Sequence, residues 1–199
     1  MSATGRPPST THAEIEAAAF ELFAERGFEA TSIEDIAAAV GVGRRTIFRY
    51  FPSKNDLAWG DFEWVNRRLR RHLEESGPGV PLMEALRRAA VLSNRYPAED
   101  LPALRQRLTL ITTVPALQAH SMLRYASWRA VVAEWSGDRL GLAPEELVPQ
   151  TIGHVALGTS MAAFTRWVEN PDEDLEACLD RAYQLLADGF ALEPAKPDR

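Results

Sequence analysis

The sequence predicts an all-α protein, and three observations support this. Apolar residues recur three and four positions apart over most of the 199 residues, which is the spacing of a helix that buries one face. Glycines and prolines separate these segments, as they do at the ends of helices. The best candidate for a strand, the β-branched stretch 109–114, lies within a longer helical pattern, so no sheet is expected.

Composition and charge narrow the class of protein. The hydrophobic content of 46% is sufficient for a sizeable core. No apolar run approaches the roughly 18 residues that a membrane-spanning helix needs, and the first residues lack an apolar signal core. We therefore expect a cytoplasmic protein without membrane contact. The formal net charge of −6 disfavours a protein that coats nucleic acid indiscriminately, because such binding needs a broad positive surface.

The first two helices are indicated by their apolar spacing and their ends. Apolar residues from 15 to 23 share one face of a first helix, which Gly27 ends. A second helix is expected to start at Thr31 or Ser32, because either hydroxyl can cap it. Thr31 is followed three positions later by Glu34, which is the spacing of a capping box.

Two further helices follow a glycine-containing turn at residues 41–43. A helix of about two turns is expected from residue 44 to 51, because Pro52 cannot continue it. Ser53 can cap the next helix, a linker that is expected to run without interruption from residue 54 to about residue 75. The remaining expected helices are 82–95, 101–113, 116–139, 145–169 and 173–190.

Two short helices joined by such a turn have the layout of a helix-turn-helix, whose second helix enters the major groove of DNA. A turn of about 100° per residue places Ile47 and Phe51 on one face of the second helix. The opposite face carries Arg45, Thr46 and Arg49. One side of this helix is therefore expected to be anchored in a core, while the other presents two guanidinium groups and a hydroxyl.

The residue types on the exposed face suit DNA. Arg45 and Arg49 are the expected base-reading residues, because one guanidinium can bond both O6 and N7 of guanine. Arg44, Tyr50 and Lys54 are expected to meet phosphates. A solvated, charged surface helix is the plain alternative. The complete set of predicted DNA contacts is Arg44, Arg45, Thr46, Phe48, Arg49, Tyr50 and Lys54.

The N-terminal segment resembles the DNA-binding domain of TetR-family transcriptional regulators. The matching string is TSIEDIAAAVGVGRRTIFRYFPSKNDL, preceded by AAAFELFAERGFEA. The resemblance implies a three-helix helix-turn-helix domain at 11–57, a linker helix, and a larger helical domain for ligand binding and dimerisation at 58–192. It further implies a bacterial, homodimeric repressor of nearby genes that binds a palindromic operator in double-stranded DNA.

Two positions depart from the family pattern. Gly43 stands where the family commonly has a serine or threonine that caps the recognition helix, so a side-chain acceptor is missing there. Phe48 stands where the family commonly has a tyrosine, so one expected phosphate hydrogen bond is lost. Phe48 can instead pack toward the first helix or touch a thymine methyl group.

The C-terminal half is rich in large apolar side chains, most of which are expected in the core. Family members that resemble this chain carry an effector pocket among the central helices, which implies a large apolar effector. The ligand-binding residues expected on this basis are Leu108, Ile111, Met122, Tyr125, Trp128 and Phe164. The later sequence also resembles the TetR branch associated with mycofactocin biosynthesis clusters and members that sense acyl-CoA thioesters. This second resemblance implies an acyl-CoA as a candidate effector.

The last two expected helices contain candidate dimerisation segments. Residues 153–164 are rich in small side chains that permit close approach of helices, and residues 179–190 carry an apolar stripe. By the family resemblance, these segments would pair with the same segments of a second subunit. Ordinary packing within one chain is the alternative.

Two other classes of protein stay open at this point. A helical enzyme is one, but the four histidines show no metal-ligand spacing and no glycine-rich phosphate loop is present, so no catalytic activity, metal or cofactor is expected. A helical ligand-binding or interaction protein without DNA binding is the other. Such a protein would show no salt-sensitive affinity for DNA.

Overall fold

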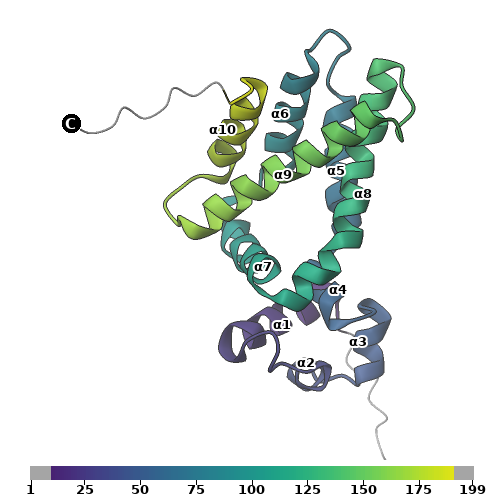
Figure 1. Ribbon diagram of the computed structural model, residues 1–199. Coiled ribbons are helices and arrows are strands. Elements are labelled where there is room, and N and C mark those ends of the chain that lie inside the picture. The colour runs from purple at the N-terminus through teal and green to yellow at the C-terminus, as the bar shows by residue number, and fades with distance from the viewer. Residues whose placement is uncertain (1–9, 191–199) are drawn as a thin grey trace, which may run out of the picture. The chain divides into compact units, whose positions relative to one another are not determined.

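The computed structural model describes residues 10–190, and within this range the regular structure is helical, without strands (Figure 1). The all-α prediction is therefore confirmed for the described residues. The chain forms two compact units. Unit 1 comprises the chain up to Asp61 together with Leu101–Ser121, and unit 2 comprises Phe62–Asp100 together with the chain from Met122 onward.

Unit 1 combines the N-terminal helices with helices from later in the chain. Its helices are α1 (His12–Arg26), α2 (Ile33–Ala39), α3 (Arg44–Tyr50), α4 (Lys54–Trp59), α7 (Leu101–Thr113) and the first turns of α8 (Pro115–Leu140). Helix α2 contacts α1 and α3, and α4 contacts α1 and α7. Apolar side chains buried in this unit include Ile15, Phe23, Ile36, Ile47, Phe51 and Leu57.

Two side chains of α7 fasten it to α1 and α4. The Gln106 amide donates a hydrogen bond to the carbonyl of Phe20 over 2.8 Å. The Arg107 guanidinium donates to the carbonyl of Ala58 over 2.9 Å and pairs with Glu16 at 3.3 Å. The bond to Ala58 gives a partner to a carbonyl in the last turn of α4, whereas the bond to Phe20 reaches a carbonyl inside α1. Helix α7 is thus held within the same compact unit as the helix-turn-helix.

The cap of α2 differs from the predicted capping box. Ser32 is the N-cap, and it exchanges hydrogen bonds with Asp35 at 2.8 and 3.1 Å. Thr31 is buried instead, and its hydroxyl donates to the carbonyl of Gly27 over 2.9 Å. The expected pairing of Thr31 with Glu34 is therefore wrong. Both pairs have the spacing of a capping box, and the burial of Thr31 removes it from the cap.

The predicted uninterrupted linker helix from residue 54 to residue 75 is wrong. It breaks into α4 and α5 (Phe62–Glu74) at Gly60 and Asp61. Gly60 has φ = +64°, in the left-handed region that side chains other than glycine rarely adopt. A Cβ at Gly60 would also lie 2.5 Å from Nη1 of Arg107. Gly60 therefore ends α4 with a backbone that favours glycine, and the guanidinium of Arg107 lies where a larger side chain would be.

Unit 2 contains the remaining helices. They are α5, α6 (Leu82–Ser93), the short 3₁₀ turn η1 (Ala98–Asp100), the greater part of α8, α9 (Leu147–Glu169) and α10 (Leu175–Ala187). The predicted helices 82–95, 116–139, 145–169 and 173–190 are present as α6, α8, α9 and α10, with ends displaced by a few residues. Helix α10 packs against α6 and α9, and α5 packs against α6 (Figure 1). Large buried side chains of unit 2 include Leu69, Leu73, Trp167, Leu175, Leu179 and Tyr183.

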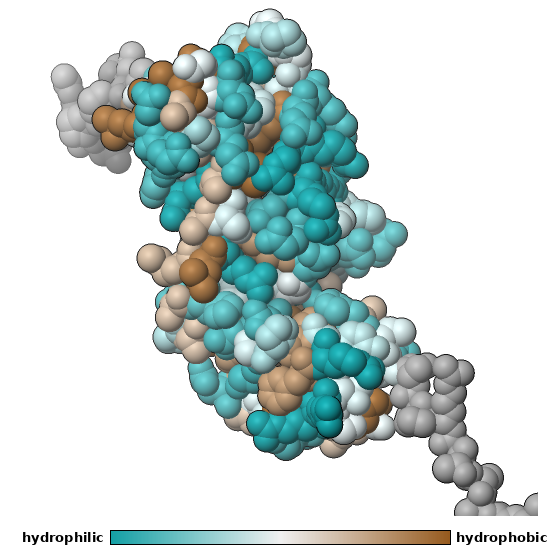
Figure 2. Space-filling view, turned by 90° about the vertical axis from the view of Figure 1, so that its right-hand side faces the viewer, coloured by the Kyte–Doolittle hydropathy of each residue, from teal (hydrophilic) through white to brown (hydrophobic). Residues whose placement is uncertain are grey.

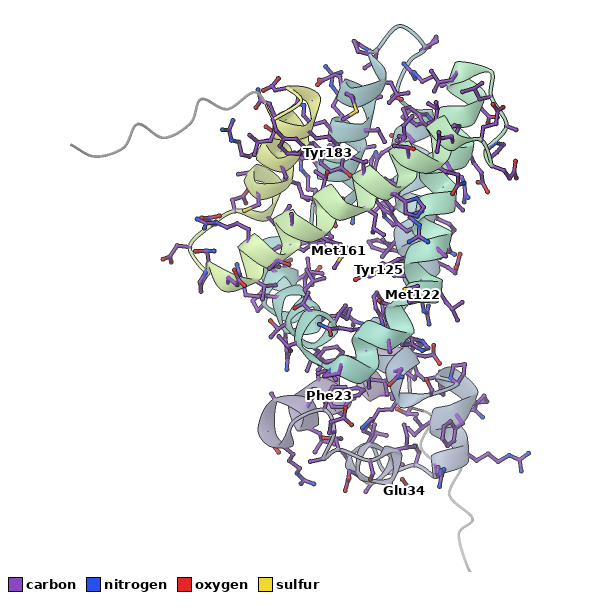
Figure 3. The ribbon with its side chains drawn as sticks, in the orientation of Figure 1. Phe23, Glu34, Met122, Tyr125, Met161 and Tyr183 are labelled. Carbon is purple, nitrogen blue, oxygen red and sulfur yellow. The ribbon has the colours of Figure 1, made fainter. Side chains whose placement is uncertain are left out.

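A buried hydrogen-bond pair joins α9 and α10. The Tyr183 hydroxyl donates to the carbonyl of Ala156 over 2.9 Å and lies 2.9 Å from Oγ of Ser160. Because the Tyr183 proton is used by the carbonyl, Ser160 must donate to Tyr183. Figure 3 shows Tyr183 extending from α10 toward α9. Burial raises the pKa of Tyr183 well above its usual range, so its hydroxyl stays protonated and can donate this bond.

Charged side chains join α6 to α10 at the surface of unit 2. Arg87 pairs with both Glu84 and Asp180, and Arg95 pairs with Glu176 at 2.7 Å. The hydrogen bonds from Arg87 and Arg88 lower the pKa of Glu84 to about 2. Ion pairs of this exposure contribute little to stability, so the apolar contacts between α6 and α10 contribute more.

Candidate nucleic-acid interface

Helix α3 begins without a side-chain cap. Gly43 is its N-cap, with an extended backbone (φ = −81°, ψ = 150°) and no side-chain hydrogen bond. A Cβ at Gly43 would meet nothing within 4 Å. The glycine therefore relieves neither strain nor crowding at this position, and a serine would fit it. The departure at Gly43 removes a cap and leaves the course of the backbone unchanged.

The two faces of α3 are divided as the sequence predicts. Ile47 is 0% exposed and Phe51 is 2% exposed, so one side of the helix is held in the core of unit 1. Arg45 and Arg49 are exposed and Thr46 is half-buried. Within the described residues, Arg45 makes no hydrogen bond or ion pair. Figure 2 shows this side of unit 1, where strongly hydrophilic groups lie beside apolar ones.

The other two cations and the aromatic rings of α3 contact one another or a neighbouring helix. Nη1 of Arg44 lies 2.6 Å from Oε1 of Glu34, in the first turn of α2. The same guanidinium lies over the ring of Phe48, 5.2 Å from its centroid, and Phe48 is 38% exposed. The Arg49 guanidinium lies over the ring of Tyr50 at 5.1 Å. Phe48 therefore faces outward and does not pack into the core.

Two predicted phosphate contacts already have partners in unit 1. The Tyr50 hydroxyl donates to the carbonyl of Thr10 over 2.8 Å. The Lys54 ammonium donates to the carbonyls of Phe28 and Thr31 over 2.8 and 3.0 Å. Lys54 thus ties the start of α4 to the segment between α1 and α2, a role that the sequence did not indicate. That Tyr50 and Lys54 contact phosphate stays a prediction.

The six predicted effector residues are divided between the two units. Leu108 and Ile111 lie on α7 in unit 1, and Ile111 is buried. Met122, on α8 in unit 2, is 70% exposed, which is unlike a lining residue of a closed pocket. Tyr125, Trp128 and Phe164 are half-buried in unit 2. The effector role of these residues stays a prediction.

The hydroxyl of Tyr125 is largely shielded from water. Burial raises the pKa of its hydroxyl to about 12. Figure 3 shows Tyr125 on α8 and Met161 on α9 extending toward one another. Met161 was not among the predicted effector residues, although the thioether of a methionine adapts well to varied apolar partners.

Sequence reasoning also missed a buried amide on α5. Asn66 is 2% exposed, and its Nδ2 donates to Oγ of Ser127 over 3.0 Å. Ser127 donates its own proton to the carbonyl of Arg124 over 2.8 Å, so the orientation of the amide is fixed. Among the described residues, Oδ1 of Asn66 has no hydrogen-bond partner. The available signal was an asparagine in line with Leu69 and Leu73 on an otherwise apolar face.

A groove of about 470 Å³ lies along α9 and α10 in unit 2. Small or apolar residues, with two arginines and two acids, line it. They are Ala162, Ala163, Arg166, Glu173, Asp174, Ala177, Cys178, Arg181, Ala182 and Leu185. The Cys178 thiol donates to Glu173 over 3.2 Å, and burial together with that carboxylate raises its pKa to about 11. The thiolate is therefore disfavoured, as expected for a structural cysteine.

Two other kinds of site are absent from residues 10–190. No helix in this range is long and apolar enough to cross a membrane. In the same range, no three histidine, cysteine, aspartate or glutamate side chains are grouped so that they could hold a metal ion.

Two family models match the chain. A model described as bacterial regulatory proteins of the tetR family matches residues 15–58. A model described as the MftR C-terminal domain matches residues 80–191, which is more than half of the chain. The first match contains α2 and α3 in full, and the second contains α6 to α10.

Known proteins are similar over nearly the whole chain. A mycofactocin biosynthesis transcriptional regulator of Mycobacterium tuberculosis, MftR, is 37% identical over 189 residues, 95% of this chain and 96% of its own length. The regulator FadR of Bacillus subtilis, solved with stearoyl-CoA, has a TM-score of 0.64 at 22% identity and covers 90% of this chain and 99% of its own. FadR of Thermus thermophilus, solved with lauroyl-CoA, has a TM-score of 0.57 at 22% identity, with 95% and 99% covered. At this identity the two structures support the fold alone.

Proposed function

This chain belongs to the TetR family of bacterial transcriptional regulators, and on that premise we propose that it is a homodimeric repressor which a small apolar effector releases from DNA. The family consists of regulators and not of enzymes. The observation that carries the proposal is the division of α3, with Ile47 and Phe51 buried and Arg45 and Arg49 exposed.

The exposed face of α3 is suited to the major groove. Arg45 and Arg49 each present a guanidinium that can bond guanine O6 and N7 together. Thr46, between them, contacts a base or a phosphate. Arg44 and Phe48 lie at the edge of the same surface, where Arg44 meets the backbone and Phe48 meets a thymine methyl group. Sequence readout therefore rests on Arg45 and Arg49.

A second subunit supplies a second recognition helix. One short helix reads too few base pairs for useful selectivity, whereas a symmetric pair reads a palindrome with half-sites about 34 Å apart. The dimer contact that we propose is the face formed by α9 and α10. It carries exposed apolar or small residues on α9, such as Val155 and Gly158, and the groove described above.

The proposed effector is an acyl-CoA. Structural relatives of the same fold were solved with stearoyl-CoA and lauroyl-CoA, and the large apolar side chains of this chain suit a fatty acyl group. The side chains that we assign to it are the half-buried aromatic residues of unit 2, Tyr125, Trp128 and Phe164. Such a regulator would act in the cytoplasm, where both the chromosome and acyl-CoA are found.

Release from DNA requires that the effector prefers a state in which the recognition helices are wrongly placed for the operator. The chain passes between the two units at residues 61–62, 100–101 and 121–122. These three passages are the covalent routes by which a change in unit 2 can reach unit 1.

Fluorescence anisotropy with duplexes from the region upstream of the protein's own gene tests the proposal. Arg45→Ala and Arg49→Ala should each weaken binding by about 1–3 kcal/mol, or about 5-fold to 150-fold, because a bidentate guanine contact is lost. Arg88→Ala removes the same charge from an exposed position on α6 and should bind as the wild type does. If all three variants bind equally well, α3 is not the reading helix.

The same assay tests the effector. Stearoyl-CoA should lower the affinity of the wild type for its operator by at least tenfold, whereas free coenzyme A and stearate should have a much smaller effect. If the operator complex stays intact at saturating stearoyl-CoA, acyl-CoA is not the effector, and the proposal that the protein binds DNA is unaffected. Wild-type protein with no salt-sensitive DNA affinity would favour an interaction protein without DNA binding.

A further inference from the structure

An acidic residue lies beside the recognition helix. Glu34 is in the first turn of α2, and its Oε1 is 2.6 Å from Nη1 of Arg44, the first residue of α3. The side chains of the pair are 58% and 62% exposed. Figure 3 places Glu34 on α2. A carboxylate in this position is unexpected, because it stands next to the residues that are proposed to meet an anionic ligand.

Glu34 is not needed to cap α2. Ser32 and Asp35 already satisfy the backbone groups at this helix end, through bonds from Asp35 N to Ser32 Oγ and from Ser32 N to Asp35 Oδ2. An acidic residue in the first turn is also favourable to the helix dipole, but Asp35 supplies one. The polar contact of the Glu34 carboxylate that the structure records is the one with Arg44. Its role is therefore to be sought in that contact.

The pair contributes little to the stability of the fold. Ion pairs between exposed side chains are worth little, because water solvates both charges and two long side chains must be held in one arrangement. Arg44 is additionally placed by the ring of Phe48, 5.2 Å away. The pair does change the charge that the surface around α3 presents. It neutralises one guanidinium on a surface where Arg45 and Arg49 carry no carboxylate partner within the described residues.

We propose that Glu34 competes with a DNA phosphate for the Arg44 guanidinium and so lowers the part of DNA affinity that is independent of sequence. A phosphate oxygen and a carboxylate oxygen bond a guanidinium in the same way, so both cannot occupy Nη1 of Arg44 at full strength. The inference rests on the proposed function, since it requires that α3 binds DNA.

The proposal has a quantitative consequence. If Arg44 is freed, it can neutralise one more phosphate, and the slope of log affinity against log salt becomes more negative by about 0.9. Over a fourfold range of salt, that change corresponds to about threefold to fourfold in affinity. The base-reading residues are not altered, so the gain should be seen on DNA of any sequence.

The experiment measures Glu34→Gln on a duplex of unrelated sequence, by fluorescence anisotropy at several salt concentrations. Glutamine keeps the length and helix propensity of the side chain but removes its charge. We expect affinity to rise about threefold to tenfold near 0.1 M salt and the salt slope to steepen by about 0.9. Glu21→Gln is the matched control, because Glu21 is an exposed acid of α1 in the same unit and has no ion pair within the described residues.

A double-variant cycle with Arg44→Ala separates competition for Arg44 from general charge repulsion. If Glu34 acts through Arg44, most of the gain from Glu34→Gln disappears in the Arg44→Ala background. Equal gains from Glu34→Gln and Glu21→Gln would overturn the proposal, because any lost negative charge would then suffice. A loss of affinity in Glu34→Gln would overturn it too, because the carboxylate would then hold Arg44 in its DNA-binding position. Wild-type protein that binds no duplex at all would instead refute the proposed function, and the inference with it.

Discussion

At the scale of single residues, Asn66 is the least satisfied polar group of the buried part of unit 2. Its amide nitrogen bonds Ser127, while its amide oxygen has no partner among the described residues. A buried acceptor without a partner costs about 1–3 kcal/mol. The helix would gain stability from an apolar side chain at this position, so the asparagine is an unusual choice for structure alone.

We predict that removing the Ser127 hydroxyl alone destabilises the protein more than removing both polar side chains of the Asn66–Ser127 pair. Ser127→Ala should destabilise the protein by about 1–3 kcal/mol, because the Asn66 amide is then left wholly unpaired in the interior. Adding Asn66→Leu to that variant should restore most of the loss, because both polar partners are then absent. Urea denaturation followed by circular dichroism measures the free energies of unfolding. A double variant that is less stable than Ser127→Ala would mean that Oδ1 of Asn66 has a partner.

Residue roles were predictable where they follow from one helix and not where they follow from contacts across the fold. Ile47 and Arg45 fall on opposite faces of α3 by helix geometry alone, and the structure places them so. Lys54 bonds the carbonyls of Phe28 and Thr31, 26 and 23 residues away. No local pattern reveals such a bond, so the sequence indicated only a free cation.

At the scale of elements, the break between α4 and α5 is the main departure from the sequence-based prediction. A single glycine within a helical pattern is often tolerated at a cost of about 1 kcal/mol, so an unbroken helix was a reasonable expectation. Here Arg107 of α7 occupies the space beside Gly60 and bonds the carbonyl of Ala58 near the end of α4. A contact with a helix that is distant in sequence thus accompanies the break, and no local pattern indicates that contact.

Gly60→Ala should therefore destabilise the protein by about 1–3 kcal/mol. The φ of +64° is unfavourable for alanine, and the added Cβ would displace the Arg107 guanidinium from its bond to Ala58. The control is Gly79→Ala, since that glycine has neither a positive φ nor an atom within 4 Å of the added Cβ. Thermal unfolding compares the two. Equal melting temperatures for both variants would show that the helix break does not need glycine.

At the scale of the whole molecule, the chain forms its two units from interleaved segments. Helix α7 and the start of α8 belong to the unit that contains the helix-turn-helix, although they follow α5 and α6 of the other unit. The TetR family and the all-α class were predictable, because the helix-turn-helix string has fixed spacing over a continuous segment. The membership of α7 was not, because it depends on Gln106 and Arg107 reaching α1 and α4. The boundary predicted at residues 57–58 stays a prediction.

The proposed dimer contact through α9 and α10 can be tested at a glycine of α9. A Cβ at Gly153 would lie 2.9 Å from the carbonyl of Arg129, so Gly153 serves packing against α8, whereas a Cβ at Gly158 meets nothing within 4 Å. Gly158→Glu therefore leaves the subunit fold intact but places two like charges at the proposed dimer face. Light scattering should then show a monomer, and operator affinity should fall by roughly 100-fold or more, because the second half-site no longer binds as part of one complex. Ala130→Glu adds the same charge on an exposed face of α8, and this variant should remain dimeric. A dimer that survives Gly158→Glu with full operator affinity would require another surface to join the subunits.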